Sequence, residues 1–536
     1  MIYINRFFFG TFNKLRKFYL NSNYYNKKIS KVNEGDLIYK PSPHLLSSLI
    51  QYQKKKINIE ELSLDEIWNN DNIKKKKYKT LNNFYWFFSL DLKSSKQKTQ
   101  TVISKWIDNY DKYKNDIWDF DLTAKRIIAW LSCHNLTYDE SNQDYKNNFN
   151  KIIKKQTNHL INEINRSELV DDKLIGCASI ILVGLCYQNE KKYLSFGSDV
   201  LKKISKFLLD NHGFTKSRNI KQLTLYLKYF ILVREWFKES QINIPEHIEE
   251  TIFNLGQSYA FLNQESNSNF LFNGNNKSED NGFDNYLKRL GYKFKNNNFE
   301  YGGYIIFKNK KICLAMDAGP SPSLNYTKDY QSGALSFEII SNGKKLITNC
   351  GYYKKKNTKL NQLSKSTAVH STLIIDDTSS CKFSKIEENW LVTKGLKILK
   401  KNCIFEKNYW KINSSHDGYL KTYNTIHERE IEFYPEQMVF IGNDKIIKKK
   451  NNYNYKFDIR FHIEPGVKLM KTQDNKTILI ELIDEGWKFT CENYDINIDN
   501  GLYFGNKSSY IDNQNIFISG ISNNQVENIK WELKKI

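Results

Sequence analysis

Proline, methionine and glycine are scarce in this chain, with 7, 4 and 24 of them among 536 residues. Long apolar runs are also missing, because no stretch of eighteen apolar residues occurs, and this excludes a membrane-spanning helix. The 8 cysteines are scattered and include no CxxC pair, so the sequence indicates reduced thiols and not a disulfide-stapled extracellular domain. Folding is therefore expected to depend on hydrophobic cores.

The composition allows two large domains and carries a strong positive charge. Hydrophobic residues make up 40% of the chain and aromatic residues 14%. The formal net charge of +22 favours a polyanionic partner, although the general richness in lysine, asparagine, isoleucine and tyrosine is also explained by coding bias. No segment resembles a nucleic-acid-binding module, so we expect no nucleic-acid partner. A uronate-containing or sulfated glycan fits the sign of the charge.

The first twenty residues combine basic and aromatic side chains without a continuous apolar core. Asn5 and Arg6 interrupt the only candidate signal segment. We expect an ordinary first helix here, with peripheral membrane attachment as the alternative.

The period of the apolar residues changes once along the chain. Apolar residues recur every three or four positions up to about residue 262, as in Val102, Ile103, Trp106 and Ile107, which is typical of helices. Short alternating strands follow residue 301, among them those predicted at 304–307 and 456–462. We therefore predict a helical domain at 1–265, a linker rich in asparagine, serine and glycine at 266–299, and an antiparallel β-sandwich at 300–536.

Two segments of the second half are the most informative. The first, 329–350, reads DYQSGALSFEIISNGKKLITNC, and its Asn342-Gly343 pair predicts a hairpin with one buried face. The second, 366–380, reads STAVHSTLIIDDTSS and places His370 at the mouth of a strand. A histidine there is a candidate base or ligand, with a hydrogen-bonding role at the rim as the alternative.

These segments, with four others in the same order, resemble the heparinase II/III-like polysaccharide lyases. The remaining matches are the W-x-x-x-x-x-A-x-R-x-x-x-W helix that starts at Trp118, Gly303-Tyr304, Asp317-Ala318-Gly319 and His416-Asp417-Gly418-Tyr419. The resemblance implies an N-terminal incomplete (α/α) toroid followed by a C-terminal β-sandwich, in agreement with the change of period. It also implies β-elimination at a uronic acid.

The chemistry implied by the resemblance needs a group that neutralises the carboxylate, a base and an acid. The family's H-x-H-x-D pattern falls on Asp329, Gln331 and Gly333 in this chain. The helix position expected to read Asn-His reads Asp172-Lys173, and no tyrosine occurs at 219–222. The usual catalytic set is therefore changed, and other groups must replace it if the reaction is retained.

We expect the replacements to be Arg218 as a carboxylate clamp and His370, Tyr304 or Tyr419 as proton-transfer groups. Arg218 and His370 are expected to face one groove. The alternative for each tyrosine is a packed aromatic ring with a hydrated hydroxyl. The candidate substrate-binding residues are Lys173, Gln331, His416 and Trp118.

No metal ligand is assigned, because one histidine with two amides is a weak zinc site. A divalent metal near His370, with Asn349 and Gln331 as oxygen donors, is the alternative that the resemblance suggests.

The leading functional hypothesis is a carbon–oxygen lyase acting on an acidic, glycosaminoglycan-like polysaccharide. A non-catalytic acidic-glycan-binding or envelope-assembly protein is the main alternative, and a binder of another polyanion is the third. The resemblance implies a cell-envelope or periplasmic location, with the cytoplasm as the alternative because the signal segment is poor. The sequence does not specify the glycan or the oligomeric state.

Overall fold

The computed structural model describes residues 15–47, 75–90, 95–167, 169–263, 270–276, 282–355, 358–386, 389–450, 454–506 and 509–536. Most of the N-terminal segment discussed above lies outside these ranges. The chain forms two compact units. The first comprises 1–207, 225–253 and 280–293, and the second comprises 208–224, 254–279 and 294–536. No helix in the described ranges is both long and apolar enough to cross a membrane.

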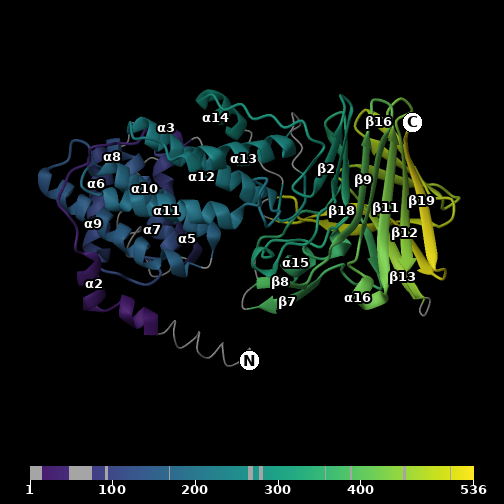
Figure 1. Cartoon of the computed structure of the whole chain (residues 1–536), viewed down its shortest axis with the longest axis horizontal. Helices are drawn as coiled ribbons and strands as arrows, with labels where there is room; N and C mark the ends of the chain where they lie inside the picture. The colour runs from purple at the N-terminus through teal and green to yellow at the C-terminus, as the bar shows by residue number, and fades with distance from the viewer. Residues whose placement is uncertain are drawn as a thin grey trace. The chain divides into compact units, whose positions relative to one another are not determined.

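The first unit is helical in its described part (Figure 1). Its elements are α2 (Asn23–Ile29), α3 (Pro43–Ser47), α5 (Lys75–Asn82), η2 (Tyr85–Ser89), α6 (Lys96–Tyr110), α7 (Phe120–Ser132), α8 (His134–Thr137), α9 (Gln143–Glu163), η3 (Ile164–Arg166), α10 (Val170–Cys186), α11 (Lys191–Leu208) and α14 (Gly282–Leu290). Helices α12 (Ile220–Glu239) and α13 (Glu246–Leu262) contribute residues to both units, and the last residue of α11, Leu208, belongs to the second.

Local sequence explains how these helices begin and which faces they bury. Ser95 and Asn142 accept hydrogen bonds from the backbone N–H three residues ahead, and so cap α6 and α9. Helix α10 is buried from Leu174 to Cys186, as expected for a helix that is apolar on all sides. The Arg126 guanidinium is fully buried beside the Trp106 ring and donates to the Gln156 side chain.

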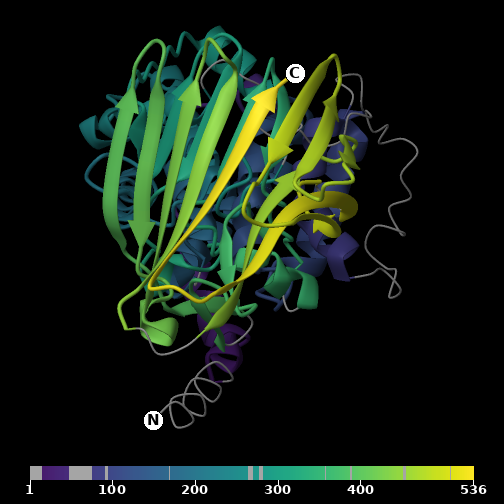
Figure 2. The ribbon, with the colours of Figure 1, turned by 90° about the vertical axis from the view of Figure 1, so that its right-hand side faces the viewer.

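The second unit is built on two antiparallel sheets. One contains β1 (Glu300–Tyr301), β2 (Tyr304–Lys308), β3 (Ile312–Asp317), β4 (Phe337–Ser341), β5 (Lys344–Thr348), β6 (Leu373–Ile375), β13 (Tyr455–Ile463), β17 (Ile496–Tyr503) and β18 (Ile511–Ser522). The other contains β9 (Ile398–Phe405), β10 (Trp410–His416), β11 (Thr425–Tyr434), β12 (Val439–Lys448), β14 (Lys468–Lys471), β15 (Thr477–Leu482), β16 (Glu485–Thr490) and β19 (Val526–Lys535). Figure 2 shows the green strands β9 to β12 and the yellow β19 side by side.

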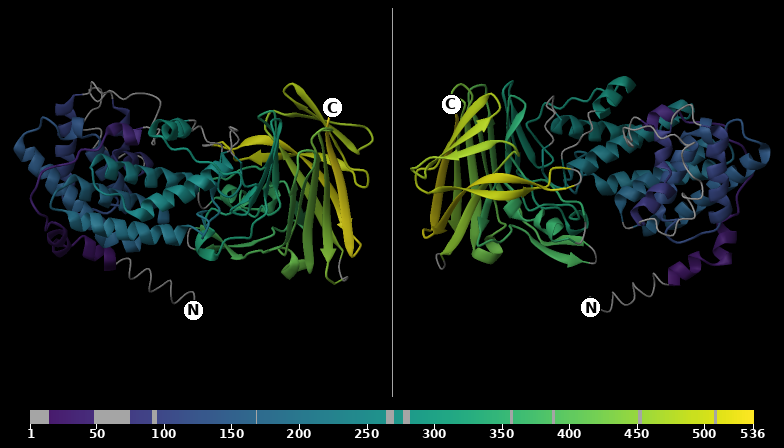
Figure 3. Two further views of the ribbon diagram at one scale, coloured as in Figure 1. Left: turned by 45° about the horizontal axis from the view of Figure 1, so that its top comes forward. Right: turned by 180° about the vertical axis from the view of Figure 1, so that it is seen from behind.

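One apolar core draws side chains from both sheets, which makes the second unit a β-sandwich. The rings of Phe337 in β4 and Trp531 in β19 stack with centroids 5.7 Å apart, and Phe461 packs against Phe489 in the same layer. Two further views show the layers of strands (Figure 3). Smaller elements complete the unit: the pair β7 (Lys382–Ile386) and β8 (Asn389–Lys394), η4 (Leu324–Tyr326), α15 (Lys359–Leu363), η5 (Thr367–Val369) and α16 (Leu420–Tyr423).

The predicted hairpin joins β4 and β5 through Asn342 and Gly343, both at positive φ, and pairs Ser341 with Lys344. The expectation of a single buried face was wrong, because every residue of β4 is buried. Glu338, on the face expected to be exposed, accepts hydrogen bonds from the backbone N–H groups of Leu271 and Asn349. A separate segment of the chain therefore covers this face.

That covering segment, 270–276, falls within the predicted linker. Its Leu271, Asn273, Gly274 and Asn276 are buried or bonded to buried partners in the second unit. The helix α14 also lies in the predicted linker range. The description of 266–299 as a plain linker is therefore corrected for its described residues. The lack of periodicity in the sequence indicated a loop at 270–276. It did not reveal that asparagine side-chain amides of this loop form hydrogen bonds with the rest of the second unit.

Candidate functional site

Arg218 stands at the turn that leads into α12. Its backbone has a φ of 56°, in the left-handed region that non-glycine residues rarely occupy. The next residue, Asn219, accepts hydrogen bonds through its side chain from the N–H groups of Lys221 and Gln222 and so starts the helix. The turn thereby directs the Arg218 side chain toward β2, β3 and the loops beside them.

Four acceptors of the second unit hold the Arg218 guanidinium. Nε donates to the carbonyl of Gly302 at 3.2 Å, and Nη1 donates to that of Pro320 at 3.2 Å. Nη2 donates to the carbonyl of Gly303 at 2.9 Å and to Oδ1 of Asp317 at 2.6 Å. A guanidinium has five N–H donors, so one hydrogen of Nη1 has no acceptor among the described residues.

Asp317 keeps this guanidinium charged. Burial is the largest single effect and lowers the pKa of Arg218, but the charge and hydrogen bond of Asp317, together with Tyr304 and Tyr330, raise the pKa above its usual value. Asp317 also accepts a hydrogen bond from the Asn273 side chain at 2.9 Å. The Arg218 guanidinium is therefore held in one position and stays protonated.

Glycines make room for the guanidinium. A Cβ at Gly319 would lie 2.4 Å from the guanidinium carbon, and one at Gly303 would lie 2.9 Å from Nη2. Gly303 also has a φ of +81°. The two glycines of the Gly303-Tyr304 and Asp317-Ala318-Gly319 motifs thus leave space for the guanidinium, and Asp317 supplies the carboxylate that pairs with it.

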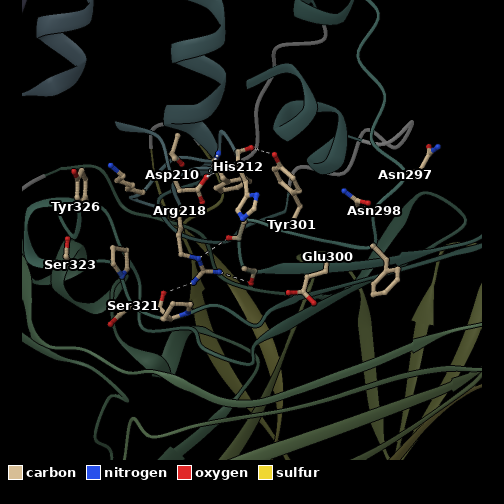
Figure 4. Close-up of a pocket in the computed structure, with 18 residues that line it drawn as sticks. Asp210, His212, Arg218, Asn297, Asn298, Glu300, Tyr301, Ser321, Ser323 and Tyr326 are labelled. Carbon is tan, nitrogen blue, oxygen red and sulfur yellow. Dashed lines mark hydrogen bonds between the residues drawn. The ribbon is translucent and has the colours of Figure 1, made fainter. Parts of the chain in front are cut away.

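The guanidinium forms part of the wall of a pocket of about 950 Å³ within the second unit, here called the Arg218 pocket. Its polar lining includes Asp210, His212, Lys216, Glu300, Tyr301 and Tyr326. The pocket is open, and Figure 4 shows His212, Arg218, Tyr301 and Glu300 around the hollow. The Tyr301 hydroxyl donates to the His212 carbonyl, and burial raises the pKa of Tyr301. The pocket combines two cations, two carboxylates, hydroxyls and an imidazole, which is suited to a polar, charged ligand.

Tyr304, a predicted catalytic residue, is buried and does not line the Arg218 pocket. Its hydroxyl donates to the Arg218 carbonyl at 2.6 Å and accepts from the Asn273 amide at 2.7 Å. Its ring lies 4.6 Å from the Arg218 guanidinium. Burial raises the pKa of Tyr304. In this geometry Tyr304 supports Arg218 and offers no exposed proton-transfer group.

His370 is also buried, and it does not line the Arg218 pocket. Its Nδ1 donates to the Ser366 carbonyl at 2.8 Å, while Nε2 has no hydrogen-bond partner among the described residues. Burial lowers the pKa of His370 to about 4, so its ring is neutral at neutral pH. A Cβ at Gly333 would lie 2.5 Å from Cδ2 of this ring, so Gly333 provides its space.

The side-chain amides of Gln331 and Asn349, which were expected near a metal at His370, already form hydrogen bonds within the protein. Gln331 accepts from the N–H of Gly274 and donates to the carbonyls of Gly351 and Ser364. Asn349 accepts from the N–H of Ser371. No cluster of three histidine, cysteine, aspartate or glutamate side chains suited to a metal occurs in the described ranges. The donor set around His370 therefore does not fit a divalent metal, although its Nε2 lone pair is unused.

Tyr419 and His416 belong to the sandwich interior. The Tyr419 hydroxyl donates to the Leu373 carbonyl at 2.8 Å. His416 accepts from the N–H of Gly418 through Nδ1, and its Nε2 lies 3.3 Å from Nδ1 of His427. Both residues are only 1% exposed, which favours a structural role for each.

Lys173 and Trp118 belong to the helical unit. Trp118 is buried, donates from Nε1 to the Tyr110 carbonyl at 3.0 Å and packs edge-on against His159. Lys173 lies half-buried in the first turn of α10. Neither lines the Arg218 pocket. Of the predicted site residues, Arg218 alone lines it.

Sequence reasoning missed the other polar residues of the pocket. Asp317 and Gly319 entered only as matches to the family, and His212 was not among the candidate site residues. The signal that was available is the Asp-Ala-Gly motif, because a carboxylate beside a small residue suits a buried ion pair. Nothing in the local sequence connects His212 with Tyr301, which is 89 positions away.

Residues 293–532 match the family model described as heparinase II/III-like, C-terminal. Among solved structures, a heparinase III has a TM-score of 0.68 at 13% identity, over 90% of this chain and 80% of that chain. A mutant of the heparan sulfate lyase HepC from Pedobacter heparinus has a TM-score of 0.67 at 12% identity, over 96% and 87% of the two chains. No curated protein matches the chain by sequence.

The structural matches extend over nearly the whole chain, so they confirm the predicted fold class of a helical toroid followed by a β-sandwich. At this identity they establish the fold. Residues 293–532 therefore form a heparinase II/III-like C-terminal domain.

Proposed function

We propose that this protein acts on an acidic polysaccharide as a β-eliminating lyase, with a uronate bound in the Arg218 pocket. The observation that carries the proposal is the remaining Nη1 hydrogen of a fixed, charged guanidinium in the wall of an open polar pocket. The fold similarity to a heparan sulfate lyase supports the class of substrate.

The chemistry follows from the position of the cation. Neutralising the uronate carboxylate makes the C5 proton removable, and a donor fixed in advance needs no reorganisation during the reaction. A base takes the C5 proton, the electron pair forms the C4–C5 double bond, and the C4–oxygen bond breaks as the leaving oxygen gains a proton. His212 is the exposed imidazole of the pocket and is our candidate base. Lys216 adds a second cation to the wall.

The test is the ultraviolet absorbance of the unsaturated uronate product. Heparin, heparan sulfate and polygalacturonate are each mixed with the full chain from neutral to alkaline pH. His212→Gln is expected to slow product formation by about two to four orders of magnitude, the usual contribution of a general base. His44→Gln, an exposed histidine of the helical unit, is the matched control and should leave the rate unchanged. A wild type that yields no absorbance on any of the glycans contradicts the lyase assignment.

The second candidate is a non-catalytic acidic-glycan-binding protein with the same fold. The observation that favours it is the burial of His370, Tyr304 and Tyr419, whose hydroxyls and Nδ1 are bonded inside the second unit. This candidate predicts retention on an acidic-glycan column, weakened by Lys216→Gln, without any unsaturated product. The column and the absorbance assay together separate the two functions.

The cell envelope is the proposed location, since the family resemblance implies it, and the cytoplasm is the alternative. Fractionation of cells that produce the tagged full chain tests this location directly. Recovery of the protein only with cytoplasmic markers contradicts an envelope role.

A further inference from the structure

A second hollow adjoins the Arg218 pocket in the second unit. It has a volume of about 560 Å³ and is here called the Lys421 pocket. Its lining includes Thr393, Gly395, Lys397, Asp417 and Lys421. Lys397 lies between β8 and β9, and Lys421 lies in the short helix α16. All of these residues fall within one compact unit, as do those of the Arg218 pocket.

The two pockets share one wall. The segment Pro320–Ser323 lines both of them. Pro320 is exposed, and the neighbouring Leu324 is 46% exposed. The segment is therefore a ridge with an apolar surface, of the kind on which a sugar ring can rest while its charged groups reach to either side.

This ridge is held from both sides. On the side of the Arg218 pocket, the Pro320 carbonyl accepts from Nη1 of Arg218. On the side of the Lys421 pocket, the Ser321 N–H donates to the Leu396 carbonyl, and the Leu396 N–H donates to Oγ of Ser321 at 2.9 Å. The close approach requires Gly395, because a Cβ there would lie 2.0 Å from Oγ of Ser321. The spacing of the two pockets is thus fixed by the fold.

The Lys421 pocket carries cations that no described acid neutralises. Lys397 and Lys421 are exposed, and neither ammonium group forms an ion pair with a described residue. The carboxylate in the lining, Asp417, accepts a hydrogen bond from the backbone N–H of Lys397 at 2.6 Å. Two lysines against one aspartate leave this pocket with a net positive charge.

We infer that the Lys421 pocket is a second anion-binding subsite, so that the protein holds an extended acidic glycan across the Pro320–Ser323 ridge and not a single charged sugar. This inference rests on the proposed function, because it assumes that the Arg218 pocket takes one acidic sugar. The ligand class is an oligosaccharide with several negative groups. The two lysines supply attraction to the chain on the far side of the ridge from Arg218.

The experiment compares chain lengths and charge variants. Dissociation constants of the full chain are measured for a heparin disaccharide and a heparin octasaccharide, in the wild type and in Lys397→Gln/Lys421→Gln. We expect the double variant to bind the octasaccharide about 3- to 10-fold more weakly, the scale of two exposed ion pairs. Its affinity for the disaccharide should be unchanged, because one pocket suffices for that ligand.

The control is Lys449→Gln/Lys450→Gln, which makes the same change of charge at exposed lysines outside both pockets. Equal weakening by the control and the test variant overturns the subsite, because it shows attraction by net charge alone. An octasaccharide that binds no better than the disaccharide, in the wild type, also overturns it. Failure of the wild type to bind either oligosaccharide contradicts the proposed function itself, and is thereby distinguished from failure of the subsite.

Discussion

Nη2 of Arg218 lies 2.6 Å from Oδ1 of Asp317, and the two side chains are 8% and 2% exposed. This ion pair joins the turn before α12 to the end of β3 inside the second unit. Each partner is held by further hydrogen bonds, Asp317 by Asn273 and Arg218 by three carbonyl groups. A residue expected from sequence to be purely catalytic is therefore also part of the buried structure.

We predict that Arg218→Met destabilises the protein by about 3–5 kcal/mol, because removing one partner leaves the buried carboxylate of Asp317 uncompensated. Urea unfolding followed by circular dichroism measures the change. Lys216→Met, a half-buried cation of the same pocket, is the control and should change the free energy of unfolding by less than Arg218→Met. An Arg218→Met variant as stable as the wild type would show that the pair contributes nothing.

A second prediction concerns the contact between Gly333 and His370. Gly333→Ala should cost about 1–3 kcal/mol, since the added Cβ meets the imidazole 2.5 Å from Cδ2. In a His370→Asn background the same change should cost less, because the smaller side chain leaves room. Urea unfolding of the two single variants and the double variant gives the coupling energy. Strict additivity would contradict the contact.

Acid should destabilise the second unit through its buried histidines. Burial lowers the pKa of His370 from 6.5 to about 4, and that of His462 to about 3. Between pH 6.5 and 4 these imidazole rings are therefore protonated in the unfolded chain but stay neutral in the folded chain. The free energy of unfolding consequently falls as the pH falls. Each such histidine contributes up to about 1.4 kcal/mol per pH unit in this window.

The variant His370→Asn tests this pH dependence, because the asparagine amide replaces the Nδ1 donor to Ser366 and does not titrate. Urea unfolding at several pH values should show a shallower decline for it than for the wild type. His44→Asn, at an exposed position, should leave the slope unchanged. Identical slopes for His370→Asn and the wild type would contradict the assignment of a neutral buried ring.

The fourth prediction concerns Asp444, whose buried carboxylate accepts hydrogen bonds from a guanidinium and an imidazole. Asp444 accepts from Nε of Arg429 and from Nε2 of His427, each at 2.7 Å. Asp444→Asn should destabilise the protein by about 3–5 kcal/mol, since Arg429 then keeps its charge without a counter-charge. Thermal unfolding measures the loss. A substitution on the sandwich surface, Asp474→Asn, supplies the comparison and should have a smaller effect.

Periodicity was sufficient to predict the two structural halves and several of the strands. The strand predicted at 304–307 corresponds to β2, and that at 456–462 lies within β13. The hairpin at Asn342-Gly343 was predicted because two positive-φ residues select one turn type. These features depend on residues that are close in sequence.

The candidate site was much less predictable, because its contacts join distant residues. Arg218 was correctly associated with carboxylate binding, but its buried partner Asp317 is 99 positions away. Gln331 and His416 were expected to bind substrate, but their polar atoms bond to Gly274 and Gly418 inside the sandwich. A polar side chain that completes a buried network has the same local signature as one that binds a ligand.

The distribution of thiols has a practical consequence. Cys133, Cys177 and Cys186 are buried in the helical unit, while Cys313, Cys350, Cys381 and Cys491 are buried in the sandwich. A small alkylating reagent reaches such sulfur atoms only when the surrounding structure opens. Mass spectrometry of peptides after timed alkylation would therefore give one opening rate for each unit from a single unlabelled sample. The ratio of the two rates would show whether the helices and the sheets unfold together or one after the other.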